Sequence, residues 1–169
     1  MSEFTRTYDP RLLPGSTVEL HASEDERAAL SKRFGLVRIE RMTARIDLER
    51  EAEGASAKGR LQAEIVQSCA VSGEDLAVSI DEPVNLHFVP ARGPSSPDEE
   101  IELEAEDLDE IEFEGSLFDL GEALAQTLVL AIDPYAVGPN AEEARRKAGL
   151  LDKDSSGPFA ALAALKKQD

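Results

Sequence analysis

The chain has 169 residues and a formal net charge of −17, with 41% hydrophobic and 31% charged residues. This balance predicts one soluble folded domain and argues against a disordered acidic chain. No apolar run approaches the ~20 residues of a membrane-spanning helix, and none follows a basic start, so we expect a cytoplasmic protein without membrane contact. A single cysteine rules out an internal disulfide.

The acidic residues are concentrated in the middle of the chain. Residues 1–60 hold 11 basic and 11 acidic side chains, whereas residues 61–140 hold 1 and 19. Such a surface repels phosphate and lacks the cations whose counterion release drives nucleic-acid binding. We therefore expect a basic protein as partner, and no direct nucleic-acid contact through the acidic face.

The first predicted element is a helix over residues 24–34. Ser23 and Glu26 form a capping box, in which the serine side chain accepts from the amide of residue 26 and the glutamate reaches back. Gly35 suits the left-handed residue that ends many helices.

Alternating apolar residues then predict a series of strands. A change of parity within residues 36–50 indicates a bulge near residues 40–43, or two short strands. Residues 51–59 are small and polar and predict a turn, and strands are expected around 61–65, 76–80 and 84–88. Pro83 cannot donate to a ladder, so we expect it at the junction of the last two strands.

Residues 101–106 alternate apolar and acidic side chains without exception, and residues 111–114 repeat the pattern. One face of such a strand packs on a core and the other displays carboxylates. The carboxylate row either protects a sheet edge from aggregation or forms a docking surface for a basic partner. The candidate binding residues are Glu102, Glu104 and Glu106.

A second helix is predicted to begin after Asp119, its N-cap, with Glu122 three residues further on. It is predicted to end before Pro134. A short helix over 141–149 and a hinge over 155–158 follow. We expect residues 1–150 to form a single domain and residues 151–169 to form the hinge and an amphipathic tail. The tail is too short to be a stable helix alone and docks on the body or on a partner. Its candidate binding residues are Phe159, Leu162, Leu165 and Lys166.

The sequence offers little for catalysis. Cys69, His21 and His87 lack a paired spacing, so we predict no metal site and no cofactor. Carboxylates are abundant, but no pair is singled out as acid and base. Neither a glycine-flanked nucleophile nor a phosphate-binding glycine loop is present. We therefore predict that the protein is not an enzyme.

Four segments in order resemble the YceD family. Residues 67–71 resemble its cysteine-centred motif, 119–122 its helix start, 130–135 its helix end and 157–166 its C-terminal tail. The likeness spans roughly residues 20–166. The residues that match the family's motifs are Gln67, Cys69, Asp119, Gly121, Glu122, Asp133, Pro134, Tyr135 and Pro158.

This resemblance implies a role in ribosome biogenesis, in accumulation or maturation of large-subunit ribosomal RNA. Many members carry two cysteines separated by two residues, whereas Ser72 takes the second position here, and Gly157 replaces the usual asparagine of the tail. We expect Cys69 to be a small buried residue at a strand end rather than a reactive thiol.

Together these patterns predict an α+β fold. Its sheet is mainly antiparallel, open or closed toward a barrel, and packs with two principal helices and the short C-terminal amphipathic segment. The spacing of the strands leaves no room for the helices of a doubly wound parallel sheet. The expected partner is a basic ribosomal protein or a large-subunit assembly intermediate. The alternative is an RNA-processing enzyme or a direct RNA-binding protein.

Overall fold

A computed structural model describes residues 3–91 and 110–149 of the chain. The chain divides into two compact units, one from Met1–Val66 and Ala77–Ile132 and the other from Gln67–Leu76 and Asp133–Asp169. The first unit carries most of the sheet and two helices, and the second carries the short helix α3 (Ala141–Lys147). The predicted α+β class is confirmed.

The main sheet has five strands in the order β2-β3-β4-β5-β6. Within the described residues it is open, with β2 and β6 at its edges, and does not close into a barrel. The pairs β2–β3 and β3–β4 are antiparallel, whereas β6 runs parallel to β5. The strands are β2 (Val18–His21), β3 (Arg38–Glu51), β4 (Gly54–Ser68), β5 (Asp75–Pro90) and β6 (Glu110–Phe113), and a separate pair joins β1 (Thr7–Tyr8) to β7 (Phe118–Asp119).

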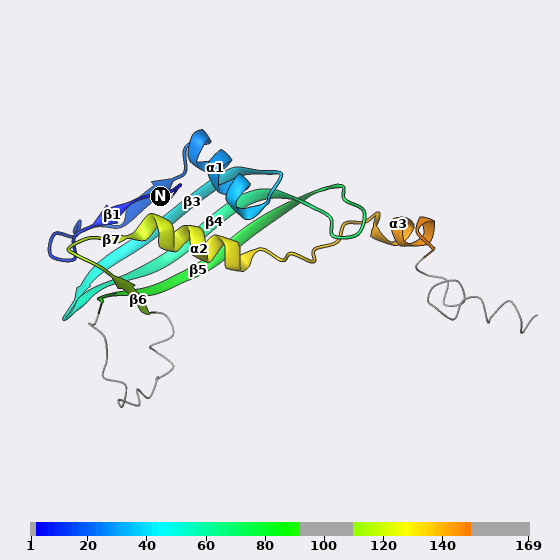
Figure 1. Ribbon diagram of the computed structural model, residues 1–169. Coiled ribbons are helices and arrows are strands. Elements are labelled where there is room, and N and C mark those ends of the chain that lie inside the picture. The colour runs from blue at the N-terminus through cyan, green and yellow to red at the C-terminus, as the bar shows by residue number, and fades with distance from the viewer. Residues whose placement is uncertain (1–2, 92–109, 150–169) are drawn as a thin grey trace, which may run out of the picture. The chain divides into compact units, whose positions relative to one another are not determined.

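The two principal helices begin as the sequence predicts. In α1 (Glu24–Phe34), the Ser23 side chain accepts from the Glu26 amide, Glu26 returns the bond, and Gly35 ends the helix with φ 67°. In α2 (Leu120–Ala131), the Asp119 side chain accepts from the Glu122 amide. Figure 1 shows both helices on the same side of the sheet.

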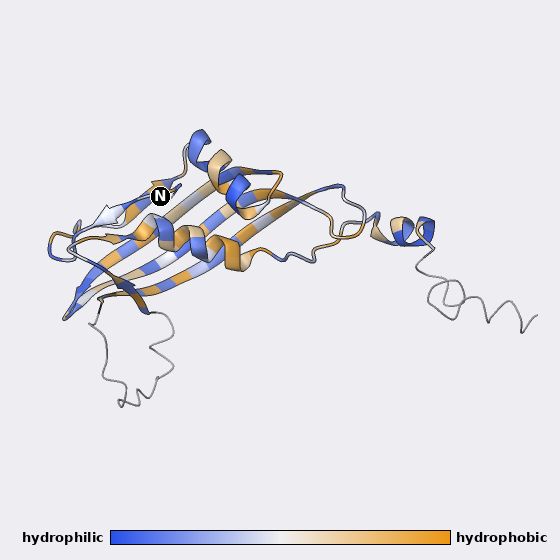
Figure 2. Ribbon diagram, viewed as in Figure 1, coloured by the Kyte–Doolittle hydropathy of each residue, from blue (hydrophilic) through white to orange (hydrophobic). Residues whose placement is uncertain are grey.

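The core lies between these helices and the sheet. Leu30 of α1, Ile46 and Leu61 of the strands, and Leu124 and Leu128 of α2 are fully buried. Apolar and polar positions alternate along the long strands, as Figure 2 shows, because successive side chains point to opposite faces. Each strand thus turns one face toward the helices and the other away from them.

The change of parity in β3 is a bulge, as predicted. The pairing of β3 with β4 shifts register between Ile39 and Arg41, and one continuous strand runs through it. Ile39 is buried before the shift, and Met42 and Ala44 are buried after it. The extra residue therefore returns the apolar side chains to the helix-covered face.

Two predictions about the strands are wrong. The predicted turn over residues 51–59 is much shorter, since β4 begins at Gly54 and its small residues Ala55 and Ala57 are fully buried. Pro83 marks no junction, because β5 continues through it. The Ala91 amide donates to Phe113 of β6, and Pro83 shares its parity, so the proline nitrogen faces away from β4 and costs that ladder nothing.

Candidate functional site

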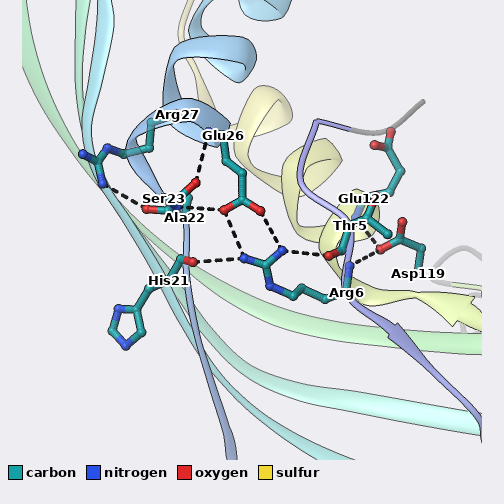
Figure 3. A network of polar contacts seen from close by, with 9 residues as sticks. All are labelled: Thr5, Arg6, His21, Ala22, Ser23, Glu26, Arg27, Asp119 and Glu122. Atoms are coloured by element: carbon teal, nitrogen blue, oxygen red, sulfur yellow. Dashed lines mark hydrogen bonds and ion pairs between the residues drawn. The ribbon is translucent and has the colours of Figure 1, made fainter.

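The motif residues Asp119, Gly121 and Glu122 gather at the start of α2, and we call them the helix-start cluster. Asp119 Oδ1 accepts from the amides of Arg6, at 2.8 Å, and of Glu122, at 3.2 Å. The Leu120 amide in turn donates to the Arg6 carbonyl at 2.9 Å. One carboxylate therefore both caps the helix and fixes the N-terminal segment beside it (Figure 3).

Gly121 is required because the N-terminal segment crosses the helix there. A Cβ atom built on Gly121 would lie 2.8 Å from the Arg6 nitrogen and closer still to the Phe4 carbonyl oxygen. Both contacts are with backbone, which has little freedom to move aside. Phe4 itself is buried in the core. The motif glycine is thus explained by close packing of main chain on main chain.

Two ion pairs join this region to α1. Arg6 pairs with Glu26 at 2.7 Å, and Arg33 pairs with Glu122 at 2.7 Å. The hydrogen bond from Arg6, reinforced by the Ser23 amide, lowers the pKa of Glu26 to about 2. Figure 3 shows Arg6 between Glu26 and Asp119, so this arginine connects the starts of both helices. The contacts of the helix-start cluster therefore hold the N-terminal segment, α1 and α2 together within the first unit.

The second unit brings together the other motif residues in what we call the cysteine loop, residues 67–76 with residues 133–140. Gln67 is buried, and its Nε2 donates to the Asp133 carbonyl at 2.8 Å. The Ala70 amide donates to the Ala136 carbonyl at 3.0 Å. These bonds hold the segment after α2 against the segment after β4.

Cys69 lies at the centre of this loop with 4% of its surface exposed. Its Sγ accepts from the amides of Gly138, at 3.3 Å, and Ser72, at 3.4 Å. These donors, that of Gly138 foremost, favour the thiolate and lower the pKa of Cys69 to about 6. The burial of the cysteine is as predicted, whereas its polar surroundings left no sign in the sequence.

Asp133, Pro134 and Tyr135 form the turn that follows α2. Asp133 Oδ1 accepts from the Tyr135 amide at 2.8 Å. The Tyr135 side chain is 81% exposed, so packing does not explain its place in the motif. Val137, two residues on, is also exposed.

A family model described as "Large ribosomal RNA subunit accumulation protein YceD" matches residues 57–166. The chain belongs to the YceD family. No curated protein and no solved structure shows significant similarity to it. The family match contains the helix-start cluster and the cysteine loop but begins after Phe4, Arg6 and Arg33. The YceD helix start is therefore stabilised here by N-terminal residues that the family model does not cover.

The predicted binding residues and the motif residue Pro158 lie outside the described residues. These are Glu102, Glu104, Glu106, Pro158, Phe159, Leu162, Leu165 and Lys166. The described end of the acidic strand does alternate as predicted: Ile111 and Phe113 of β6 pack against the core, whereas Glu110 and Glu112 are exposed. Among the described residues no group of three or more histidines, cysteines or acids is arranged to hold a metal ion, and no helix is long and apolar enough to cross a membrane.

The described parts of this YceD chain differ sharply in charge. Residues 61–91 and 110–132, which include β5, β6 and α2, contain no lysine and no arginine. Arginines gather instead on the open face of β3 and β4, which points away from the helices. Arg45 lies opposite Arg60, and these pair with Glu19 at 3.2 Å and Asp81 at 2.8 Å.

This arginine face went unrecognised in the sequence. Its signal is the alternation of basic and apolar residues along β3 and β4, which becomes a cluster only when the two strands pair. The side chains border a shallow hollow of about 490 Å³. Its lining includes Arg41, Arg45, Arg60, His21 and Gln62.

Proposed function

We propose that this protein supports the accumulation or maturation of large-subunit ribosomal RNA as a non-enzymatic factor that contacts a basic protein. Membership of the YceD family, over residues 57–166, is the observation that carries the ribosomal part of this proposal. The partner would be a basic ribosomal protein or a large-subunit assembly intermediate.

The distribution of charge supports contact with a basic protein. Segments 61–91 and 110–132 carry exposed carboxylates and no lysine or arginine. Opposite charge on a partner would steer its approach and select against acidic surfaces, including RNA. A factor of this kind needs no catalytic group, and the polar contacts of the helix-start cluster serve to hold elements of the fold together.

Depletion of the protein tests the ribosomal role. We expect less mature large-subunit RNA and fewer large subunits in sucrose-gradient sedimentation with RNA sizing, and restoration by the wild-type chain. A normal large-subunit profile after depletion would contradict the role while leaving the fold untouched.

Pull-down from lysate with added salt tests the surface. The triple change E102K, E104K and E106K, and separately deletion of residues 157–169, should each reduce recovery of basic partners at least tenfold. The matched control changes Glu24 and Asp25, two exposed acids of α1, to lysine, and this charge reversal should leave recovery unchanged. Equal recovery with all variants would reject the acidic strand and the tail as the binding surface.

Direct RNA contact is the second candidate, and the arginine face is the observation that favours it. Filter binding of large-subunit RNA across salt concentrations separates the two, since phosphate contact gives a steep decrease of affinity with salt. The paired acids Glu19 and Asp81 already neutralise Arg45 and Arg60, so we expect weak binding with a shallow salt dependence. Tight binding that the double change R45E and R60E abolishes would favour the RNA-binding alternative.

A further inference from the structure

Among the residues that the structure describes, the outer edge of β5 is only partly covered. β6 pairs with it from His87 to Pro90, and no other strand in the described ranges pairs with this edge ahead of His87. The Ala91 amide donates to the Phe113 carbonyl of β6 at 2.9 Å, so odd-numbered residues of β5 direct their peptide groups to this edge. The peptide groups that face it ahead of β6 include those of Ser79, Asp81, Pro83 and Asn85.

A hollow of about 320 Å³, lined by both apolar and polar side chains, lies beside this edge, within the first unit. It is formed by residues 82–86 of β5 and by Thr127, Leu130 and Ala131 of α2. Leu130 is 85% exposed, the largest exposed fraction among the large apolar side chains of the described residues. A strand edge beside a hollow with an exposed leucine suits an extended peptide, because main-chain hydrogen bonds provide affinity and the hollow can select a side chain.

The charge around this edge indicates what such a peptide would be. Glu82 lines the hollow, and Glu110 and Glu112 are exposed on the neighbouring β6. No lysine or arginine occurs in residues 61–91 or 110–132. We propose that this edge of β5, which no described strand covers ahead of His87, and the hollow beside Leu130 bind an extended basic segment of a partner protein by strand addition. The choice of a protein as partner rests on the proposed function.

A second copy of the chain fits this edge poorly. Pairing β5 with β5 of another copy would bring together two surfaces that carry acids and no lysine or arginine, which repel each other. Pro83 also removes one donor from the middle of the edge, a feature that discourages unselective pairing of strands. A basic segment removes the repulsion, and it forgoes only the one hydrogen bond that Pro83 cannot donate.

Amide hydrogen exchange of the full chain, resolved by NMR, tests the proposal. The probe is the peptide Lys-Val-Lys-Thr-Lys-Val-Lys, and its control replaces each lysine by glutamate. We expect the amides of Ser79, Asp81 and Asn85 to exchange at least tenfold more slowly with the lysine probe and to be unaffected by the glutamate probe. Charge attraction without strand addition would leave these three amides unchanged and overturn the proposal.

Variants separate the edge from the hollow. N85P removes an edge donor that no described strand uses, and L130S shortens a side chain that is almost fully exposed, so both should fold. Each should weaken binding of the lysine probe at least tenfold. L12S alters a comparably exposed leucine, at 80%, and should bind as the wild type does. Binding of the lysine probe by N85P and L130S as tight as that of L12S and the wild type would overturn the proposal.

Two results without any probe would also overturn it. Edge amides already protected in the dilute free chain would show that its own residues cover β5, and protection that rises with protein concentration would show a second copy. Failure here is distinguishable from failure of the proposed function. Loss of large subunits on depletion with an unresponsive edge rejects only the binding site, and a protected edge with a normal ribosome profile rejects only the ribosomal role.

Discussion

The helix-start cluster and the cysteine loop both consist of YceD motif residues, yet they differ in what packing explains. In the helix-start cluster every motif side chain has a structural role, since Asp119 caps α2, Gly121 admits the N-terminal backbone, and Glu122 pairs with Arg33. In the cysteine loop, a buried thiol is surrounded by amide donors and Tyr135 is left exposed. The helix-start cluster is therefore explained by the stability of the fold, whereas the cysteine loop has features that stability alone does not require.

The largest difference should appear when each region's glycine becomes alanine. G121A places a Cβ against the backbone of Phe4 and Arg6 and should lower the free energy of unfolding by about 3 kcal/mol. G138A brings its Cβ to 3.6 Å from Leu76 Cδ1, an ordinary contact, so its effect should stay within about 0.5 kcal/mol. Urea denaturation measures the free energy of unfolding of both variants. Equal decreases would contradict the difference between the two regions.

Removing one aspartate from each region should give a smaller difference. D119A deletes the acceptor of both the Glu122 and Arg6 amides and should cost about 1 to 2 kcal/mol. D133A deletes the acceptor of the exposed Tyr135 amide, which water replaces, and should cost about 0.5 kcal/mol. A larger loss from D133A in urea denaturation would assign the second region a greater structural role.

The Arg6–Glu26 ion pair should make the stability of the protein depend on pH in the acid range. The pKa of Glu26 is lowered to about 2 from its ordinary value of 4.5, so its contribution is complete above about pH 4.5 and disappears as the pH falls toward 2. The pair is partly exposed, and we expect E26Q to cost about 1 kcal/mol at pH 6. Chemical denaturation of both proteins from pH 6 to 2 should show this gap closing, and a constant gap would contradict the role of its charge.

The smallest effect concerns Cys69. Its pKa is lowered to about 6 by amide donors, so the stabilisation is complete above the unfolded-state pKa near 9 and is lost as the pH falls through 6. The stability of the wild type should therefore rise relative to C69S between pH 6 and 9. Thiolate absorbance of the folded protein should titrate with a midpoint near 6, and a midpoint near 9 would contradict the donor geometry.

Local patterns were sufficient for much of this fold. Ser23, Glu26 and Gly35 predicted the limits of α1, Asp119 that of α2, and the parity change the bulge of β3, because each depends on neighbours within a few residues. Pro83 was misjudged because its effect depends on which side of β5 carries a partner strand. The brief turn between β3 and β4 was missed because the small residues after it are buried by tertiary packing.

The candidate sites divide in the same way. The order of four motifs was enough to predict the YceD family, but no pattern showed that Asp119 binds Arg6, or that Gln67 and Asp133 meet. The arginine face, and the edge of β5 that no described strand covers, likewise appear only after the strands have paired, because strand pairing sets which side chains and peptide groups become neighbours.

The sequence alone was enough to establish the caps of the helices, the strand periodicity and the excess of acid in residues 61–140, and its four motifs in order indicated the resemblance to the YceD family. Packing of the whole chain was needed for the open sheet with its parallel last pair, the backbone crossing at Gly121 and the amide donors around Cys69. These features depend on contacts between residues far apart in the chain, whose geometry is fixed only when the core is complete.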